Sequence, residues 1–113
     1  MKLLTYDSGS GPRCGVLRGD DVVDVAALLG VDRPLEDVRA LLETGESAVD
    51  QVRTALASNS AAPSVPLASV QLRSPVLQPP TVRDYMIYEE HATGQGTRTR
   101  EEAWYRMPIF YFS

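Results

Sequence analysis

The chain of 113 residues contains one cysteine, Cys14, and one histidine, His91. A single cysteine excludes an intrachain disulfide and a cysteine-rich zinc site, and we interpret Cys14 as a small, half-buried strand residue. No apolar run approaches the roughly 18 residues that a membrane helix needs. The first residues also lack the apolar stretch of a secretory signal peptide. We therefore expect a cytoplasmic protein with no membrane partner.

Positive charge is also scarce. The formal net charge is −4, which excludes non-specific binding to nucleic acid. Hydrophobic residues make up 43% of the chain and charged residues 23%, which is the balance of an ordinary globular domain. A chain of this length has room for one domain with a modest core.

Aromatic residues are nearly absent from the first 84 positions, where Tyr6 stands alone. The other seven crowd into the last 29 residues: Tyr85, Tyr88, Trp104, Tyr105, Phe110, Tyr111 and Phe112. We interpret Trp104, Tyr105 and residues 110–112 as core residues rather than a binding platform.

The first part of the chain predicts a small β-meander covered by helices. Turn residues separate three expected strands, at 2–6, 13–18 and 21–25. A single helical turn is expected over 26–30. Two amphipathic helices should then form a hairpin over the meander, one that begins after Asp32 as its N-cap and ends at Gly45, and one over residues 47–57.

The second part alternates extended and helical segments. We expect a linker or surface loop over 59–66, a strand over 70–73, and extended backbone over the proline-rich residues 74–80. The further expected elements are a helix over 81–92, a basic glycine-bearing loop over 94–100, a helical turn over 101–105 and a strand over 108–112. The predicted fold class is α+β.

The one constellation that could carry chemistry surrounds His91, because histidine is the side chain best suited to exchange a proton near neutral pH. Glu89 and Glu90 lie close enough in sequence to raise its basicity or to orient its ring. On a continuous helix, Asp84 would lie two turns before His91, roughly 10 Å along the axis. That spacing suits a metal ligand and a general base with substrate between them.

A purely structural interpretation of the same residues stays open. Thr81 and Asp84 have the spacing of a capping box, and a histidine in the last turn of a helix interacts favourably with its dipole. Glu89 and Glu90 could be a solvated face. The basic loop with Arg98 and Arg100 is either a solvated loop or a lid that binds an anionic substrate.

These segments resemble the fumarylacetoacetate hydrolase family. The resemblance is carried by Arg83-Asp84-Tyr85, by Glu89-Glu90-His91, by the glycine-bearing loop, and by the run from Trp104 to Ser113. The opening strands, Lys2 to Tyr6, Gly15 to Leu17 and Val22 to Val25, resemble the small N-terminal domain of many bacterial members. The resemblance is specific over residues 79–113.

The resemblance implies a hydrolase of carbon–carbon bonds in acylpyruvates or β-diketo acids, or a related hydratase or decarboxylase of aromatic catabolism. In that family Mg²⁺ or Ca²⁺ chelates the substrate, a histidine activates water, and the departing carbanion is held as an enolate. Carried over by position, His91 is the catalytic base, with Glu90 beside it. Asp84 is a metal ligand, and Arg100 contacts the substrate. At the position two after Asp84, Met86 replaces a tyrosine of some members.

The family's Glu-x-Glu metal pair has no counterpart after residue 91. We therefore expect an N-terminal domain over residues 1–73, then a linker and the first helix and strand of a mainly-β catalytic domain over 74–113. The expected whole protein acts on a small keto acid and forms a homodimer, and this portion is inactive alone. The alternatives are a stand-alone interaction or regulatory module of the same ancestry, and a complete small enzyme that uses His91 with Glu89 or Glu90.

Overall fold

The computed structural model describes residues 1–58, 61–96, 99–107 and 110–112. It divides into two compact units, Met1–Leu77 and Gln78–Ser113. This division falls four residues after the expected boundary at 73/74. Within the described part of the chain, no helix is long and apolar enough to cross a membrane.

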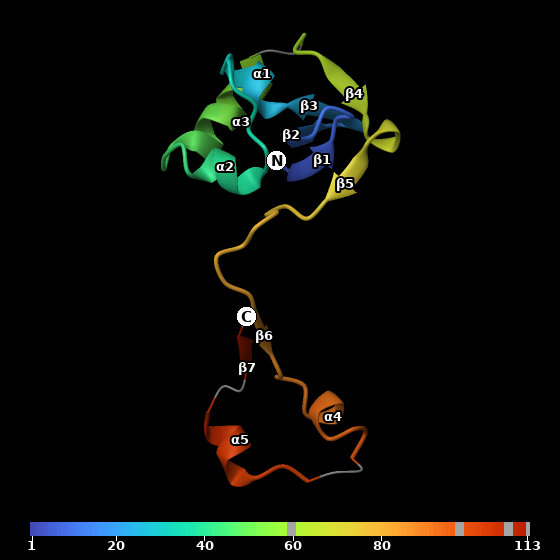
Figure 1. Ribbon diagram of the computed structural model, residues 1–113, viewed down its shortest axis with the longest axis vertical. Coiled ribbons are helices and arrows are strands. Elements are labelled where there is room, and N and C mark those ends of the chain that lie inside the picture. Colours follow the sequence, from blue (N-terminus) through green and yellow to red (C-terminus); the bar gives the residue numbers. More distant parts are fainter. Residues whose placement is uncertain (59–60, 97–98, 108–109, 113) are drawn as a thin grey trace. The chain divides into compact units, whose positions relative to one another are not determined.

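The first unit is built on an antiparallel sheet, as the strand and turn pattern predicts. Among its described residues the strand order is β4-β3-β2-β1-β5 (Figure 1). The central hairpins turn through Gly9, Gly11 and Gly19, which all have positive φ values that favour glycine. The strands are β1 (Leu3–Asp7), β2 (Pro12–Arg18), β3 (Asp21–Asp24), β4 (Ser64–Pro66) and β5 (Gln71–Arg73).

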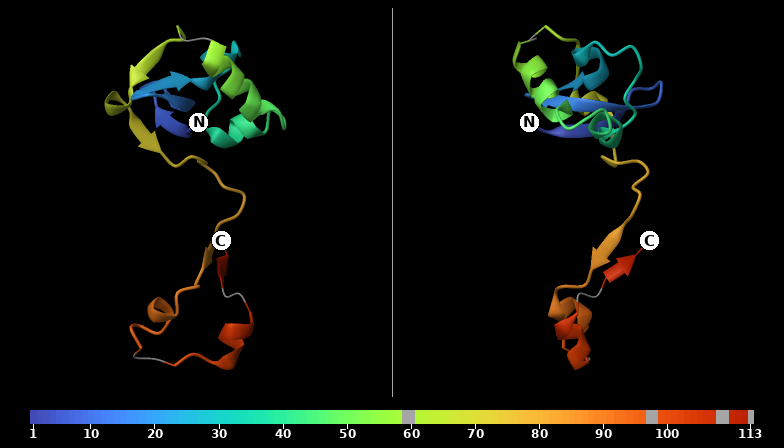
Figure 2. Two further views of the ribbon diagram at one scale, coloured as in Figure 1. Left: turned by 180° about the vertical axis from the view of Figure 1, so that it is seen from behind. Right: turned by 90° about the vertical axis from the view of Figure 1, so that its left-hand side faces the viewer.

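Three helices gather on one side of this sheet (Figure 2): α1 (Val25–Leu29), α2 (Val38–Leu42) and α3 (Ala48–Ser58). Their apolar residues close over the strands, and the fully buried side chains include Val16, Val23, Leu41 and Val52. The expected α+β class is confirmed. The expected helical turn at 26–30 is confirmed as α1, which Gly30 ends in a left-handed conformation.

The start of the first hairpin helix differs from the expectation. The N-cap is Asp37, whose side chain accepts from the Ala40 amide at 2.8 Å, and not Asp32. The backbone of Leu35 is extended toward the sheet, where its carbonyl accepts from the Cys14 amide at 2.7 Å. The Leu35 carbonyl is thus bonded to the sheet rather than to an amide of a helical turn, and α2 begins only at Val38.

The expected loop over 59–66 is also wrong in part, because its last residues form β4; residues 59–60 lie outside the described residues. β4 pairs with β3 through Val22↔Val65 and lies at the end of the strand order. That edge position explains how a strand can contain Pro66, which has no amide to donate to a neighbouring strand.

The second unit holds β6 (Arg83–Tyr85), α4 (Glu89–Ala92), α5 (Glu102–Arg106) and β7 (Phe110–Phe112). The expected helix over 81–92 is therefore wrong, since only its last four residues are helical. The first residues pair as a strand with β7, with Tyr85 opposite Phe110. The centroids of their two rings lie 5.1 Å apart. The expected helical turn at 101–105 is confirmed as α5, whereas positions 108–109 of the expected last strand lie outside the described residues.

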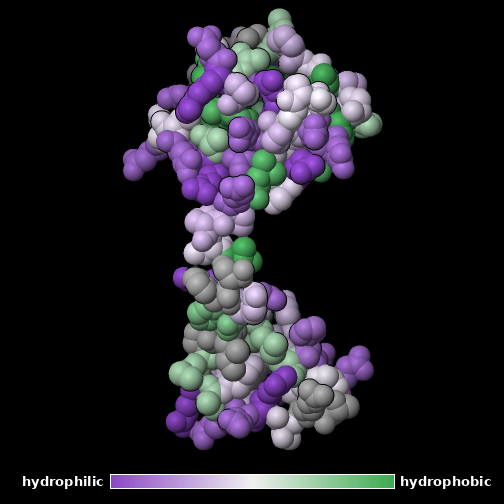
Figure 3. Space-filling view, in the orientation of Figure 1, coloured by the Kyte–Doolittle hydropathy of each residue, from purple (hydrophilic) through white to green (hydrophobic). Residues whose placement is uncertain are grey.

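The second unit buries few of its own side chains. Among the described residues of this unit up to Tyr111, only Ala92 and Thr93 are buried. Apolar side chains are visible on its surface in Figure 3, and exposed large residues include Ile87, Tyr88 and Met107. The interpretation of Tyr105, Phe110 and Tyr111 as core residues is wrong for this chain, because all three are exposed.

Candidate functional site

His91, the expected base, and Asp84, the expected metal ligand, line one pocket of the second unit. This His91 pocket has a volume of about 310 Å³. Asp84 comes from β6 and His91 from α4, and both side chains are exposed. The remaining lining residues are Tyr85, Met86, Phe110 and Tyr111. Asp84 and His91 thus share a pocket although they do not share a helix, and the two-turn helical spacing between them is not formed.

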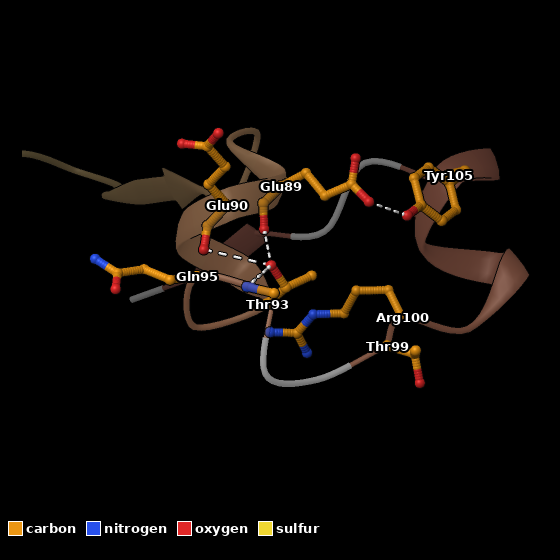
Figure 4. Close-up of a pocket in the computed structure, with 8 residues that line it drawn as sticks. Glu89, Glu90, Thr93, Gln95, Thr99, Arg100 and Tyr105 are labelled. Atoms are coloured by element: carbon orange, nitrogen blue, oxygen red, sulfur yellow. Dashed lines mark hydrogen bonds between the residues drawn. The ribbon is translucent and has the colours of Figure 1, made fainter.

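Glu90 and Arg100 line a different pocket of the same unit. This Arg100 pocket has a volume of about 720 Å³ and is also lined by Glu89, Thr93, Thr99 and Tyr105. The Nε atom of Arg100 is buried and has no hydrogen-bond partner among the described residues. Figure 4 shows the Arg100 side chain extending back from its loop toward Thr93, while the Glu90 carboxylate points away from it.

Tyr105 is a pocket residue that the sequence interpretation missed. Its hydroxyl donates a hydrogen bond to Glu89 Oε1, which joins α5 to α4 (Figure 4). This bond raises the pKa of Tyr105 above its ordinary value, because the nearby carboxylate favours the protonated phenol. The sequence signal was weak, since an aromatic residue in an apolar segment is more often part of a core.

Thr93 anchors the first half of the loop that leads to Arg100. The Thr93 hydroxyl donates to the Glu89 carbonyl at 2.8 Å and accepts from the Gly96 amide at 3.2 Å. The Gln95 amide also donates to the Glu90 carbonyl, at 2.8 Å. The loop therefore leaves α4 in a defined direction. Arg98, the other basic residue of the expected lid, lies outside the described residues.

The described residues do not fit a Mg²⁺ or Ca²⁺ site by themselves. These ions take six or more oxygen ligands, usually with several carboxylates. In the His91 pocket Asp84 is the single carboxylate among the lining residues. Within the described ranges, no group of three or more His, Cys, Asp or Glu side chains could hold a metal.

Comparison with family models found no match, and comparison with curated proteins found none either. Among solved structures, the chain is similar to the maleylpyruvate hydrolase from Sphingobium sp. SYK-6, with 28% sequence identity and a TM-score of 0.52. The match covers 74% of this chain and 31% of that one, so this chain spans less than a third of the hydrolase. The match confirms the predicted resemblance to the fumarylacetoacetate hydrolase family.

Proposed function

We propose that this chain is the N-terminal portion of a hydrolase that cleaves carbon–carbon bonds in acylpyruvates or related β-diketo acids. The observation that carries the proposal is the match to a maleylpyruvate hydrolase over 74% of this chain. The placement of Asp84 and His91 in one pocket supports it. A hydratase or decarboxylase of similar substrates is the related alternative chemistry.

In this proposal His91 is the general base. It takes a proton from water, and the resulting hydroxide adds to a substrate carbonyl carbon. The adjacent carbon–carbon bond then breaks, and its electron pair stays on the departing carbon, which takes up a proton. Glu90 adjoins His91 on α4 and is the second catalytic residue of this proposal.

Arg100 and Asp84 bind rather than transfer protons in this proposal. Arg100 receives a carboxylate of the keto acid, because a guanidinium pairs with a carboxylate through two parallel hydrogen bonds. Asp84 contributes one ligand to a Mg²⁺ or Ca²⁺ site. Its other ligands come from outside the described residues, so the 113-residue chain is inactive alone.

A chimera tests the proposal. In it, residues 1–113 replace the region of the maleylpyruvate hydrolase that the matching 74% of this chain covers. We expect hydrolysis of maleylpyruvate in the presence of Mg²⁺ and a loss of at least about a hundred-fold in kcat in H91A, the size typical of a missing general base. Y88F is the control, because the Tyr88 side chain is exposed. Equal turnover by the parent chimera and H91A contradicts the role of His91.

The second candidate is a stand-alone interaction module. The observation that favours it is the closed core of the first unit, which packs three helices on its own sheet. A folded, monodisperse 113-residue chain together with a folded but inactive chimera would favour this candidate. Turnover by the chimera would favour the hydrolase.

We also propose that the whole protein is a homodimer. Support comes from the exposed apolar residues of the second unit, such as Ile87, Met107 and Phe110, because such surfaces are covered in stable assemblies. Light scattering of the purified chimera should give twice the protomer mass, and a single protomer mass would contradict the proposal.

A further inference from the structure

The Arg100 pocket contains a carboxylate, that of Glu89, and a guanidinium, that of Arg100, which do not form an ion pair with each other. Glu89 and Arg100 both line it, and both act on the pKa of Tyr105, which Glu89 raises and Arg100 lowers. No ion pair joins Glu89 to Arg100 in the described part of the chain. A carboxylate this close to a guanidinium would normally be drawn to it.

The geometry gives a reason. The Glu89 carboxylate reaches across to the Tyr105 hydroxyl on α5, while the Arg100 guanidinium lies on the Thr93 side of the pocket (Figure 4). This contact also raises the pKa of Tyr105, so its hydroxyl stays a hydrogen-bond donor over the physiological range. Glu89 is thus held by a neutral donor although a cation is available.

We propose that Tyr105 is a positioning residue of the Arg100 pocket: its hydroxyl holds the Glu89 carboxylate toward α5 and keeps it from pairing with Arg100. The consequence for function rests on the proposed role of Arg100 in binding a substrate carboxylate. An Arg100 that is paired with Glu89 would have to break that pair before it could receive a ligand. Tyr105 therefore leaves the guanidinium available.

The ligand-free test follows the Arg100 side chain by NMR in the 113-residue chain, with R100K used to assign its Nε–H signal. In Y105F, which removes one oxygen atom, Glu89 is released to accept from Arg100. We expect solvent exchange of the Arg100 Nε–H to slow by about two- to five-fold, the range for a partly exposed ion pair. In the double variant Y105F/E89Q the charged acceptor is gone, and exchange should return to the parent rate.

The double variant separates positioning from folding. If Tyr105 merely held α5 in place, the change in Y105F would persist in Y105F/E89Q. The matched control is Y88F, which removes the same atom from an exposed tyrosine just before α4. Unchanged exchange in Y105F, or a change that Y105F/E89Q does not reverse, overturns the proposal.

A second measurement keeps this inference distinct from the proposed function. Pyruvate serves as the carboxylate probe and is titrated against the parent chain, Y105F, Y105F/E89Q and Y88F. We expect binding to be about two- to five-fold weaker in Y105F and restored in Y105F/E89Q. If the parent chain does not bind pyruvate, the role of Arg100 fails, while the ligand-free exchange still decides the role of Tyr105.

Discussion

Two ionisable side chains in the first unit stay protonated because of their surroundings. Burial raises the pKa of Cys14 to about 12, with Asp24 and Asp37 adding to the shift. Burial also raises the pKa of Tyr6 to about 12. The Asp24 carboxylate adds to this shift, and it accepts a hydrogen bond from the Tyr6 hydroxyl at 3.3 Å. A thiol in this state is a poor nucleophile, which fits the interpretation of Cys14 as a strand residue, although its side chain is fully buried rather than half-buried.

These shifts predict a loss of stability at alkaline pH. Above the ordinary thiol value of 9.0 the unfolded chain releases protons that the native chain keeps until about 12. The free energy of unfolding should therefore fall as pH rises through this window. Urea midpoints of the 113-residue chain between about pH 8 and pH 11 measure it. C14A should show a shallower fall, and a midpoint that does not change with pH in the parent chain would contradict the account.

The sequence identified the chemical types of the candidate residues better than their arrangement. His91 stands out because it is the single histidine of the chain, whereas the resemblance to a known family singled out Asp84 and Arg100. Their division between two pockets depends on the turn of backbone between β6 and α4, which residue types alone do not specify. Tyr105 was missed because its partner, Glu89, is 16 residues away.

At the scale of elements, Asp37 ties together α2 and the end of the first unit. One carboxylate oxygen accepts from the Ala40 amide at 2.8 Å, and the other accepts from the Leu77 amide at 2.9 Å. Thr5 adds a further tie to this segment, since its hydroxyl donates to the Pro75 carbonyl at 2.9 Å. The backbone that leaves the first unit is therefore fixed as far as Leu77.

The two aspartates give a matched test of this cap. D37A should destabilise the first unit by about 1–2 kcal/mol, the usual cost of a lost N-cap. D32A should change stability by no more than about 0.5 kcal/mol, because Asp32 is exposed and lies before the helix. Urea unfolding of both variants measures the difference. Equal effects, or a larger effect of D32A, would contradict Asp37 as the N-cap of α2.

The errors at the level of elements share a physical cause. Residues 82–88 include β-branched and aromatic types that favour strands, namely Val82, Tyr85, Ile87 and Tyr88. The acidic residues beside His91 instead favour a helix. The conflict is resolved by pairing with Phe110–Phe112, about 25 positions later, and such long-range pairing leaves no local signal. The meander was easier to predict because its partners are neighbours in sequence and its turns contain glycine.

At the scale of the whole molecule, the two units differ in how much they bury. The first has a continuous core under three helices, while the second buries only Ala92 and Thr93 among its described residues up to Tyr111. The second unit is also the one that carries every candidate site residue. The residues proposed to do chemistry thus belong to the part of the chain with the least packing of its own.

This difference predicts unequal protection from hydrogen exchange. Amides of β1 and β2 should exchange at least about a hundred-fold more slowly than those of β6 and β7, since opening of a packed core costs several kcal/mol. Exchange followed by NMR on the 113-residue chain gives both sets at once. Equal protection in the two units would mean that the second is as stable as the first.

The central claim is that these residues carry part of a metal-dependent hydrolase site and not all of it. Calorimetric titration of the 113-residue chain with Mg²⁺ and Ca²⁺ tests this most directly. The account predicts no saturable binding in the micromolar range, because Asp84 supplies one carboxylate and hard divalent ions need several oxygen ligands. Micromolar binding of one ion per chain that is lost in D84N would contradict it, since the metal site would then be complete within these residues.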